Sequence, residues 1–395
     1  MHSYNGLFEA MITDSSLTSA FLDASLGKRD RKDVQRVLNN LETEKAKLKQ
    51  LLVDETLNFT KHPICIINEY SCQKEREIIK PYYRYEQVVH HLVVTQLKPI
   101  IMKGFYSYSC GSIPKRGCHY GKKHMERWIR KYPQDKTLYV LKMDIRHFFE
   151  NVDHDILKDM LSKRIRDKKF LRLCFKIIDH VEKGLPLGYY TSQWFANFYL
   201  SEFDHHMKEV LKAENYMRYM DDMSVLSLDK EHLHEIRRGA EKYLKEKLHL
   251  ELKGDWQVFP MLHDMQDEGG RPLDFMGFKF YRNHTTLRKS ILKRVRRKAN
   301  KIWKKKCAGK SINHKDATSM ISRVGWLDST DTYDYYLRYI KPKVIIRDMK
   351  HTVSKHQRKE NRYDRLESSQ RVTGNSTFRI GYEFLPNHCV SKKKH

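Results

Sequence analysis

Apolar residues recur at spacings of three and four along several polar stretches, and this periodicity predicts amphipathic helices. We expect residues 30–54 to be helical, a helix that starts at Tyr85 and ends before Pro99, and a helix at 191–213. Asp229 is expected to cap a further helix, since Asp side chains accept hydrogen bonds from the free amides of a first turn. The buried stripe of that helix is expected to be Leu233, Ile236, Ala240, Leu244 and Leu248.

Short apolar runs between these stretches predict strands. They lie at 64–67, 75–80, 138–144, 216–228 (two strands joined by a charged turn) and 248–253, where the sequence is LHLELK. Asp153 is expected to cap a helix after the third run, and residues 104–133 to form a loop and a helix. Elements from residue 138 onward therefore alternate as strand, helix, hairpin, helix and strand. This order is typical of an α+β sheet layered by helices.

The pattern changes after residue 285. Residues 289–306 contain ten Lys or Arg and no acidic residue, while apolar residues keep a helical spacing. This combination predicts a helix with one buried face and one strongly basic exposed face. The expected buried stripe, with Trp303 in the core, is Ile291, Leu292, Val295, Ala299, Ile302 and Trp303. A second helical region is expected at 314–345, and a polar, basic tail follows from about residue 350.

The charge of the chain favours a polyanionic partner, with an anionic membrane or a merely well-solvated surface as alternatives. Lys and Arg number 76 against 49 Asp and Glu, a formal charge of +27 in 395 residues, and the 40% of hydrophobic residues suffices for a folded core. No apolar run is long enough to predict a membrane span, and the first residues do not resemble a secretory signal. The seven cysteines form no CxxC pair, which argues against a disulfide framework or zinc ribbon and fits a reducing cytoplasm.

Three acidic residues lie at a strand end and in a hairpin turn, where they could bind metal ions. Asp144 ends the apolar strand, and Asp221 and Asp222 occupy the hairpin turn. Two adjacent carboxylates in a rigid turn repel each other, so at least one should have a raised pKa unless a cation is close. Taken singly, Asp144 is more typical of a cap or turn residue, and the Asp-Asp turn could be merely solvated. Together they predict a site for two Mg²⁺ ions, which prefer oxygen ligands and serve phosphoryl transfer.

Four motifs, in this order along the chain, resemble reverse transcriptases of bacterial and phage retroelements. They are MDIRHFF at 143–149, GLPLGYYTSQWFANFYL at 184–200, YMDD at 219–222, and LELKGD at 250–255 followed by DFMGFKF at 274–280. The resemblance covers about residues 30–345 and implies an α+β right-hand polymerase, with fingers, a palm of antiparallel sheet packed by helices, and an α-helical thumb. The implied parts are a helical extension at 1–60, fingers at 61–140, palm at 141–283 with fingers helices interleaved at 155–183, thumb at 284–346 and a basic tail at 347–395.

The resemblance also implies roles for individual residues. Two Mg²⁺ ions, with Mn²⁺ as a substitute, would be held by Asp144, Asp221, Asp222 and the carbonyl of Ile145. The dNTP would contact Lys74, Arg76, Phe149, Leu187, Gly188, Gln193 and Lys253. The primer grip would be Phe275, Met276 and Gly277, and the template–primer backbone would contact Lys293, Arg296, Arg297 and Lys301. Phe149 would exclude a 2′-hydroxyl and Lys253 would protonate pyrophosphate; the alternatives are a plain core phenylalanine and an exposed surface lysine.

Leu187 and its neighbours narrow the resemblance. An aliphatic residue before Gly188, with Ser192–Gln193 beyond, resembles the enzymes of diversity-generating retroelements. There the aliphatic residue is associated with misincorporation opposite template adenines, since it cannot hydrogen-bond as glutamine does; alternatively, Leu187 merely packs. This resemblance implies an RNA template copied from a DNA or RNA primer into mutated cDNA, and a small basic accessory protein that forms a ring. The alternatives are an antiphage-defence reverse transcriptase and a degenerate palm that only binds RNA, which the intact aspartates disfavour.

Overall fold

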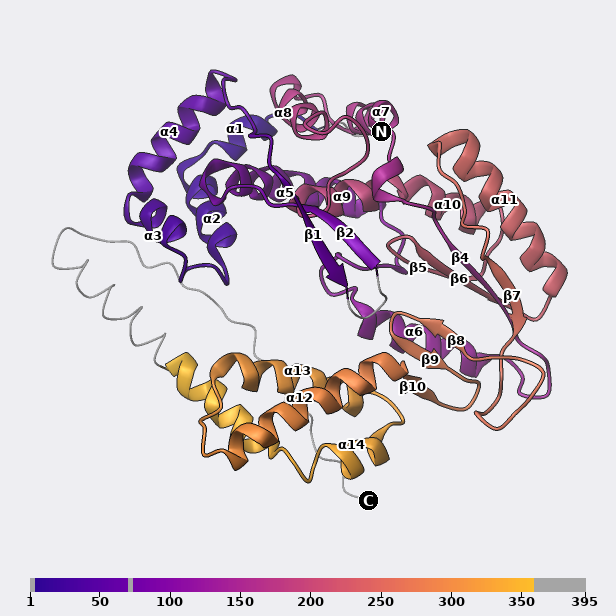
Figure 1. Cartoon of the computed structure of the whole chain (residues 1–395). Coiled ribbons are helices and arrows are strands. Elements are labelled where there is room, and N and C mark those ends of the chain that lie inside the picture. Colours follow the sequence, from indigo (N-terminus) through magenta and orange to yellow (C-terminus); the bar gives the residue numbers. More distant parts are fainter. Residues whose placement is uncertain (1–3, 70–73, 359–395) are drawn as a thin grey trace. The chain divides into compact units, whose positions relative to one another are not determined.

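The chain is divided into two units in the computed structural model, which describes residues 4–69 and 74–358. The first unit runs to Ile291 and includes Ser329–Asp331, and the second contains Leu292–Asp328 and the residues from Thr332 on. Helices and antiparallel strands are mixed in the first unit, and the second is helical, which confirms the predicted α+β class (Figure 1). None of the described helices is long and apolar enough to cross a membrane.

The first unit begins with helices α1 (Leu7–Met11), α2 (Asp14–Ser25), α3 (Lys32–Asn39) and α4 (Leu41–Val53). The stretch at 30–54 is helical as predicted, but it forms two helices, α3 and α4, because the helix is interrupted at Asn40. The side-chain amide of Asn40 donates to the carbonyl of Arg36 at 2.9 Å, and such local bonds compete with the helical ladder.

Helix α5 (Val88–Ile101) is the central helix of this part, since α1, α2 and α9 (Tyr190–Tyr199) all pack against it. Pro99 lies inside α5, so the expectation that the helix ends before it was wrong. Ile100 and Ile101 are buried, and this apolar burial in the last turn offsets the hydrogen bond that proline cannot donate.

A five-stranded sheet carries the predicted acidic residues. Its strands are β3 (Ser109–Cys110), β4 (Tyr139–Asp144), β5 (Asn215–Tyr219), β6 (Asp222–Ser227) and β7 (Gln257–Pro260), in the spatial order β3-β5-β6-β4-β7. Only β3 pairs in parallel. Helix α11 (Lys230–Leu248) packs against β4, β6 and β7. Its cap and its stripe are as predicted: Asp229 accepts from His232 N, and Leu233, Ile236, Ala240, Leu244 and Leu248 are buried.

The other helices described in the first unit are α6 (Cys118–Lys131), α7 (His154–Arg164), α8 (Lys168–Ile178) and α10 (Ser201–Glu209), of which α6 packs against β3 and β5. Asp153 caps α7 as predicted. The expected single helix over 191–213 is instead α9 and α10, which break at Leu200; the hydroxyl of Ser201 there donates to the carbonyl of Phe198. The predicted strand at 248–253 was also wrong, because His249 is left-handed and only Leu252 forms a bridge, to Ile145.

Two smaller sheets complete the first unit. Strands β1 (Ile64–Glu69) and β2 (Lys74–Ile79), both predicted, pair antiparallel with Ile67 opposite Arg76. Strands β8 (Leu273–Phe275), β9 (Phe278–Phe280) and β10 (Thr285–Leu287) form a three-stranded antiparallel sheet. The side chain of Lys74 and the tail from residue 359 lie outside the described residues.

The second unit contains most of α12 (Lys289–Cys307), with α13 (His314–Asp328) and α14 (Tyr333–Tyr339). Lys298 and Lys305 on α12 both form ion pairs with Asp316 on α13. Val295, Ala299 and Ile302 are buried as predicted. Trp303 is 45% exposed, so placing it in the core was wrong: the buried face of the helix is narrower than the apolar pattern suggested.

Candidate active site

The three predicted acidic residues meet at one end of the five-stranded sheet. Asp144 is the last residue of β4 and lies directly opposite Asp222, the first residue of β6. The amide of Ile145 donates to the carbonyl of Asp221 at 3.2 Å. Because β4 and β6 are antiparallel, the end of one strand necessarily lies beside the start of the other. Residues far apart in the sequence are therefore neighbours here.

The acidic turn is a two-residue connection in a rigid frame. Tyr219 pairs with Asp222 across the hairpin, which leaves Met220 and Asp221 as the turn. Met220 has a φ of 56°, a left-handed conformation that such tight hairpins require and that non-glycine residues seldom adopt. Its amide donates to the carbonyl of Cys110 on β3 at 3.1 Å. The neighbouring strand therefore fixes the turn in place.

Burial, and to a smaller extent the charge of Asp144, raise the pKa values of both acids of the turn. Burial raises the pKa of Asp221, the charge of Asp144 raises it further, and Lys253 and Arg76 oppose the change. Burial also raises the pKa of Asp222, to about 7, while Lys142 lowers it and Asp144 and Asp221 add to the rise. A raised pKa was predicted for at least one acid of the turn and is found for both, with burial as the largest cause. Such a pair is ready to accept cations.

Lysines supply the nearest positive charges. Lys253 Nζ lies 2.7 Å from Asp144 Oδ1 and forms an ion pair with it. Apart from this ion pair, the oxygen has no hydrogen-bond partner. Lys142 Nζ lies 3.9 Å from Asp222 Oδ2 and donates to the carbonyl of Asp274 at 2.8 Å. Lys142 was not among the site residues predicted from the sequence. In a strand, residues two apart in the sequence lie on the same face of the sheet. Lys142, two residues before Asp144, could have been identified from this alternation.

The donor set fits a divalent metal ion, although its side chains do not converge. Within residues 4–69 and 74–358, no three His, Cys, Asp or Glu side chains form a group that could hold a metal. Oδ1 of Asp222 is nevertheless buried without a hydrogen-bond partner, a costly arrangement for a carboxylate. A cation with a preference for oxygen would relieve this cost by drawing the three carboxylates together in place of Lys253.

The segment at Leu187–Gly188 lies against strand β2. The amide of Ile79 donates to the carbonyl of Leu187 at 2.8 Å. Gly188 has a φ of 109°, and a Cβ atom there would lie 2.0 Å from the carbonyl oxygen of Ile79. Only glycine allows this approach. Arg76 lies on the same strand, and its charge acts on Asp221.

Two other residues predicted to contact the nucleotide have structural partners. Phe149 is half-buried, stands edge-on to Phe148 with ring centroids 5.5 Å apart, and accepts the amide of Leu185 at its carbonyl. Gln193 Oε1 accepts from the hydroxyl of Ser112 at 2.7 Å. Neither contact tests the predicted roles, which stay predictions.

The predicted primer grip is the turn between β8 and β9. Phe275 pairs with Phe278, which leaves Met276 and Gly277 as a two-residue turn with φ values of 53° and 91°. The side chains of Phe275 and Met276 are buried, and Met276 packs on Gly121 of α6. A primer could therefore reach the backbone of this turn but not those two side chains.

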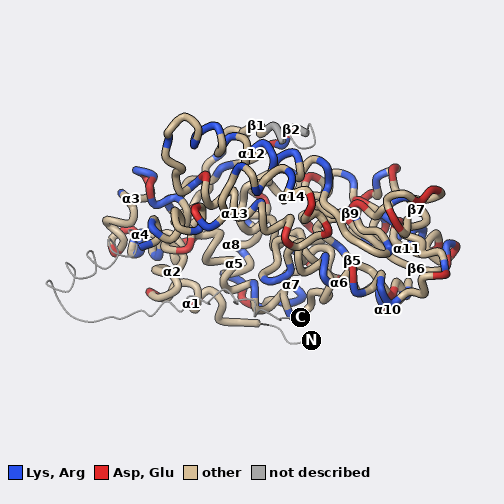
Figure 2. Tube along the Cα trace, turned by 90° about the horizontal axis from the view of Figure 1, so that it is seen from below, with Lys and Arg blue, Asp and Glu red and all other residues tan. Residues whose placement is uncertain are grey.

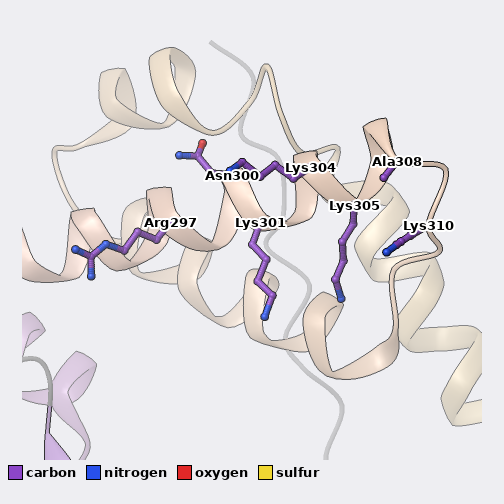
Figure 3. Close-up of a pocket in the computed structure, with 7 residues that line it drawn as sticks. All are labelled: Arg297, Asn300, Lys301, Lys304, Lys305, Ala308 and Lys310. Atoms are coloured by element: carbon purple, nitrogen blue, oxygen red, sulfur yellow. The ribbon is translucent and has the colours of Figure 1, made fainter.

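The predicted nucleic-acid backbone contacts lie on α12, along which Lys and Arg are frequent (Figure 2). Lys293, Arg296, Arg297 and Lys301 are all exposed. The guanidinium of Arg296 lies 4.4 Å from the ring centroid of Tyr339. Arg297 and Lys301 line a shallow pocket together with Asn300, Lys304, Lys305, Ala308 and Lys310 (Figure 3). Among the described residues no acidic side chain lines this pocket, so its lining favours anions.

Comparisons with known proteins agree with the motifs. Residues 68–280 match the family described as reverse transcriptase (RNA-dependent DNA polymerase). The chain is similar to the protein YkfC of Escherichia coli, at 27% identity over 173 residues that cover 40% of this chain and 45% of YkfC. Over 129 residues it is 27% identical to the group II intron-encoded protein LtrA of Lactococcus lactis, covering 30% of this chain and 21% of LtrA.

Further similarities extend to a retron enzyme and to solved structures. The retron Ec73 reverse transcriptase of Escherichia coli is 30% identical over 107 residues, which cover 24% of this chain and 34% of that protein. The chain thus spans less than half the length of each of these relatives. Telomerase from Candida tropicalis in complex with a fragment of telomeric RNA matches with a TM-score of 0.46 at 11% identity, over 74% of this chain and 57% of that one.

Proposed function

The chain belongs to the reverse transcriptase family, and we propose that it is an RNA-directed DNA polymerase that makes cDNA with Asp144, Asp221 and Asp222 at its catalytic centre. The observation that carries the proposal is the pairing of Asp144 with Asp222 across β4 and β6, beside Asp221. Three acidic residues from two chain segments are then neighbours at one end of the sheet, and two of them have raised pKa values.

These carboxylates, with the carbonyl of Ile145, would hold two Mg²⁺ ions, for which Mn²⁺ could substitute. The ions supply activation of the primer 3′-hydroxyl and neutralisation of the triphosphate. Lys253 Nζ, 2.7 Å from Asp144, would become free once metal binds and could protonate the departing pyrophosphate. Arg76 would contact the triphosphate, since Arg is suited to forked contacts with phosphate oxygens.

The remaining proposed roles concern the selection of deoxynucleotides and the binding of template and primer. Phe149 would crowd a 2′-hydroxyl and so favour deoxynucleotides. The exposed cations of α12 would follow the phosphates of an RNA template and its primer, in a manner independent of sequence and sensitive to salt. The resemblance to diversity-generating enzymes implies one further partner, a small basic accessory protein.

We expect purified protein to extend a DNA primer annealed to an RNA template when Mg²⁺ and all four dNTPs are present. Ribonucleotides should be used at least tenfold less efficiently, because Phe149 would exclude the 2′-hydroxyl. Denaturing gels of labelled primer measure both quantities. A protein that is folded by circular dichroism but extends no primer in Mg²⁺ or Mn²⁺, on several RNA templates, would contradict the proposal.

We further propose that the enzyme is error-prone opposite adenine, because Leu187 offers the nucleotide no hydrogen bond. Leu187→Gln should lower errors opposite template adenines several-fold and leave errors opposite other bases nearly unchanged, since a wrong pair in a site that expects a hydrogen bond leaves a polar group unpaired. Deep sequencing of cDNA from one defined template provides the measurement. Leu187→Ile is the matched control and should keep the wild-type spectrum. If wild-type errors are no more frequent at adenine than elsewhere, the antiphage-defence alternative gains instead.

A further inference from the structure

The peptide that precedes Asp221 is held from several sides. Met220 is left-handed, with a φ of 56°, which is unfavourable for a residue that carries a Cβ atom. Its amide donates to Cys110 at 3.1 Å. Its carbonyl accepts from Nη1 of Arg218 at 3.0 Å. A conformation of this kind persists only when its surroundings hold it.

The guanidinium of Arg218 is the group that reaches this carbonyl, and its side chain is only 1% exposed. Its Nε and Nη2 donate to the two oxygens of Asp204, at 2.7 and 2.6 Å. This forked contact fixes the plane of the guanidinium. Because Asp204 occupies the edge formed by Nε and Nη2, the remaining nitrogen Nη1 is aimed at the acidic turn.

Asp204, on α10, holds Arg218 in place, and both of its carboxylate oxygens accept hydrogen bonds. Its side chain has no solvent exposure. Besides Arg218, its carboxylate accepts from the hydroxyl of Ser109 at 2.5 Å and from that of Tyr216 at 2.8 Å. Buried charges are tolerated when they are paired and every lone pair is used. The anchor thus joins β3, β5 and α10 beneath the turn.

Asn197, on α9, forms a second arm of the same network. Its side-chain oxygen accepts from Nη1 of Arg218 at 3.2 Å. Its side-chain amide donates to the carbonyls of Gly111 and Gln193 and lies 3.4 Å from the sulfur of Met220. The backbone and the side chain of Met220 are therefore both tied to one buried polar cluster.

We propose that Arg218, anchored by Asp204, is a positioning residue that sets where Asp221 and Asp222 present their carboxylates to metal. This inference rests on the proposed function, since it assumes that those carboxylates bind Mg²⁺. The pair lies beneath the turn, and both of its side chains are almost fully buried. It acts through the carbonyl of Met220, which is the peptide group directly before Asp221.

The first test replaces the pair by apolar side chains of similar size, Asp204→Leu plus Arg218→Met. Such a replacement often leaves stability unchanged, because no buried charge remains unpaired. We expect the variant to fold, to need at least threefold more Mg²⁺ for half-maximal thermal stabilisation without substrate, and to extend primers at least tenfold more slowly at saturating dNTP. The substrate-free Mg²⁺ titration reports the site even if the wild type extends no primer, so it separates this inference from the proposed function.

Arg218→Lys is the second variant and keeps the buried charge opposite Asp204. A single ammonium cannot grip both carboxylate oxygens and the Met220 carbonyl, so Mg²⁺ affinity and rate should fall between those of the wild type and the double variant. If the double variant does not fold, Arg218→Lys decides alone. A folded variant of either kind with the wild-type Mg²⁺ midpoint and rate would overturn the inference.

Lys45→Met is the control for the loss of a buried cation whose ion pairs lie far from the acidic turn in the sequence. Lys45, on α4, lies 2.7 Å from Asp14 and 2.9 Å from Glu42, and its side chain is 5% exposed. The substitution should lower the melting temperature and leave the Mg²⁺ midpoint and the extension rate at 25 °C unchanged. A comparable loss of Mg²⁺ affinity in this control would mean that general destabilisation, rather than positioning, explains the variants of Arg218.

Discussion

Asp221→Asn combined with Asp222→Asn should lower RNA-templated primer extension at least 10³-fold while leaving the protein folded. The physical reason is the loss of two anionic metal ligands, whose ions contribute several kcal/mol of transition-state stabilisation; about 4 kcal/mol corresponds to roughly 10³ in rate. Single-turnover extension of a labelled primer on RNA measures the change. Asp159→Asn is the control, because Asp159 is an exposed carboxylate paired only with Lys163 on the surface of α7.

The same double variant should be more stable than the wild type at high pH when metal is chelated. Burial raises the pKa of Asp222 in the folded protein to about 7, from a usual value of 3.8. The folded state therefore binds more protons than the unfolded state between these values, and the stability of the wild type falls as pH rises through this window. Since the Asp222 side chain is 24% exposed, we expect the asparagine variant to gain only roughly 2 kcal/mol at pH 8 and almost nothing at pH 4. Equal melting differences at both pH values would contradict this electrostatic account.

Gly188→Ala should be the most damaging single substitution outside the acidic residues. A Cβ atom at this position would lie 2.0 Å from the carbonyl oxygen of Ile79, and the φ of 109° is unfavourable for any residue with a side chain. Strand β2 must then move away, which breaks the hydrogen bond from Ile79 to Leu187 and displaces Arg76. We expect the free energy of unfolding to fall by roughly 2–4 kcal/mol and the KM for dNTP to rise at least tenfold. Urea denaturation and steady-state kinetics are the measurements.

Gly27→Ala separates the clash from the backbone strain. Gly27 also has a positive φ, 71°, but no atom lies within 4 Å of the place a Cβ would take. It should therefore cost only about 1 kcal/mol, the strain of one left-handed residue. The KM for dNTP should stay at the wild-type value. If Gly188→Ala behaves like this control, the segment at Leu187–Gly188 does not depend on its contact with β2.

Strands β1, β2, β4, β5 and β6, the caps at Asp153 and Asp229 and the acidic hairpin could be predicted from the sequence because their signals are local. The apolar run that ends at Asp144 and the turn at Met220–Asp221 depend on neighbours within a few residues. The pairing of Asp144 with Asp222 is not local, and it followed only from the order of the motifs. The structure adds the register that makes the two residues direct partners.

The differences between prediction and structure arose where tertiary packing or a single side chain overrides periodicity. Asn40 and Ser201 break helices that an apolar pattern carries straight through, because each offers a side-chain hydrogen bond to the backbone. Pro99 is retained in α5 because the residues after it are buried. The contact between Arg218 and Asp204 could not be foreseen, since nothing in either segment indicates that an arginine of β5 meets an aspartate of α10.

The most direct test of the central claim is a count of bound metal ions. Mn²⁺ titration is followed by electron paramagnetic resonance, with template, primer and a non-hydrolysable dNTP present. The wild type should bind two ions tightly. Asp144→Asn and Asp222→Asn should each lose at least one of them, because the two residues face each other across β4 and β6. If Asp144→Asn binds as many Mn²⁺ ions as the wild type, that result contradicts the claim that Asp144 and Asp222, which are far apart in the sequence, share one metal centre.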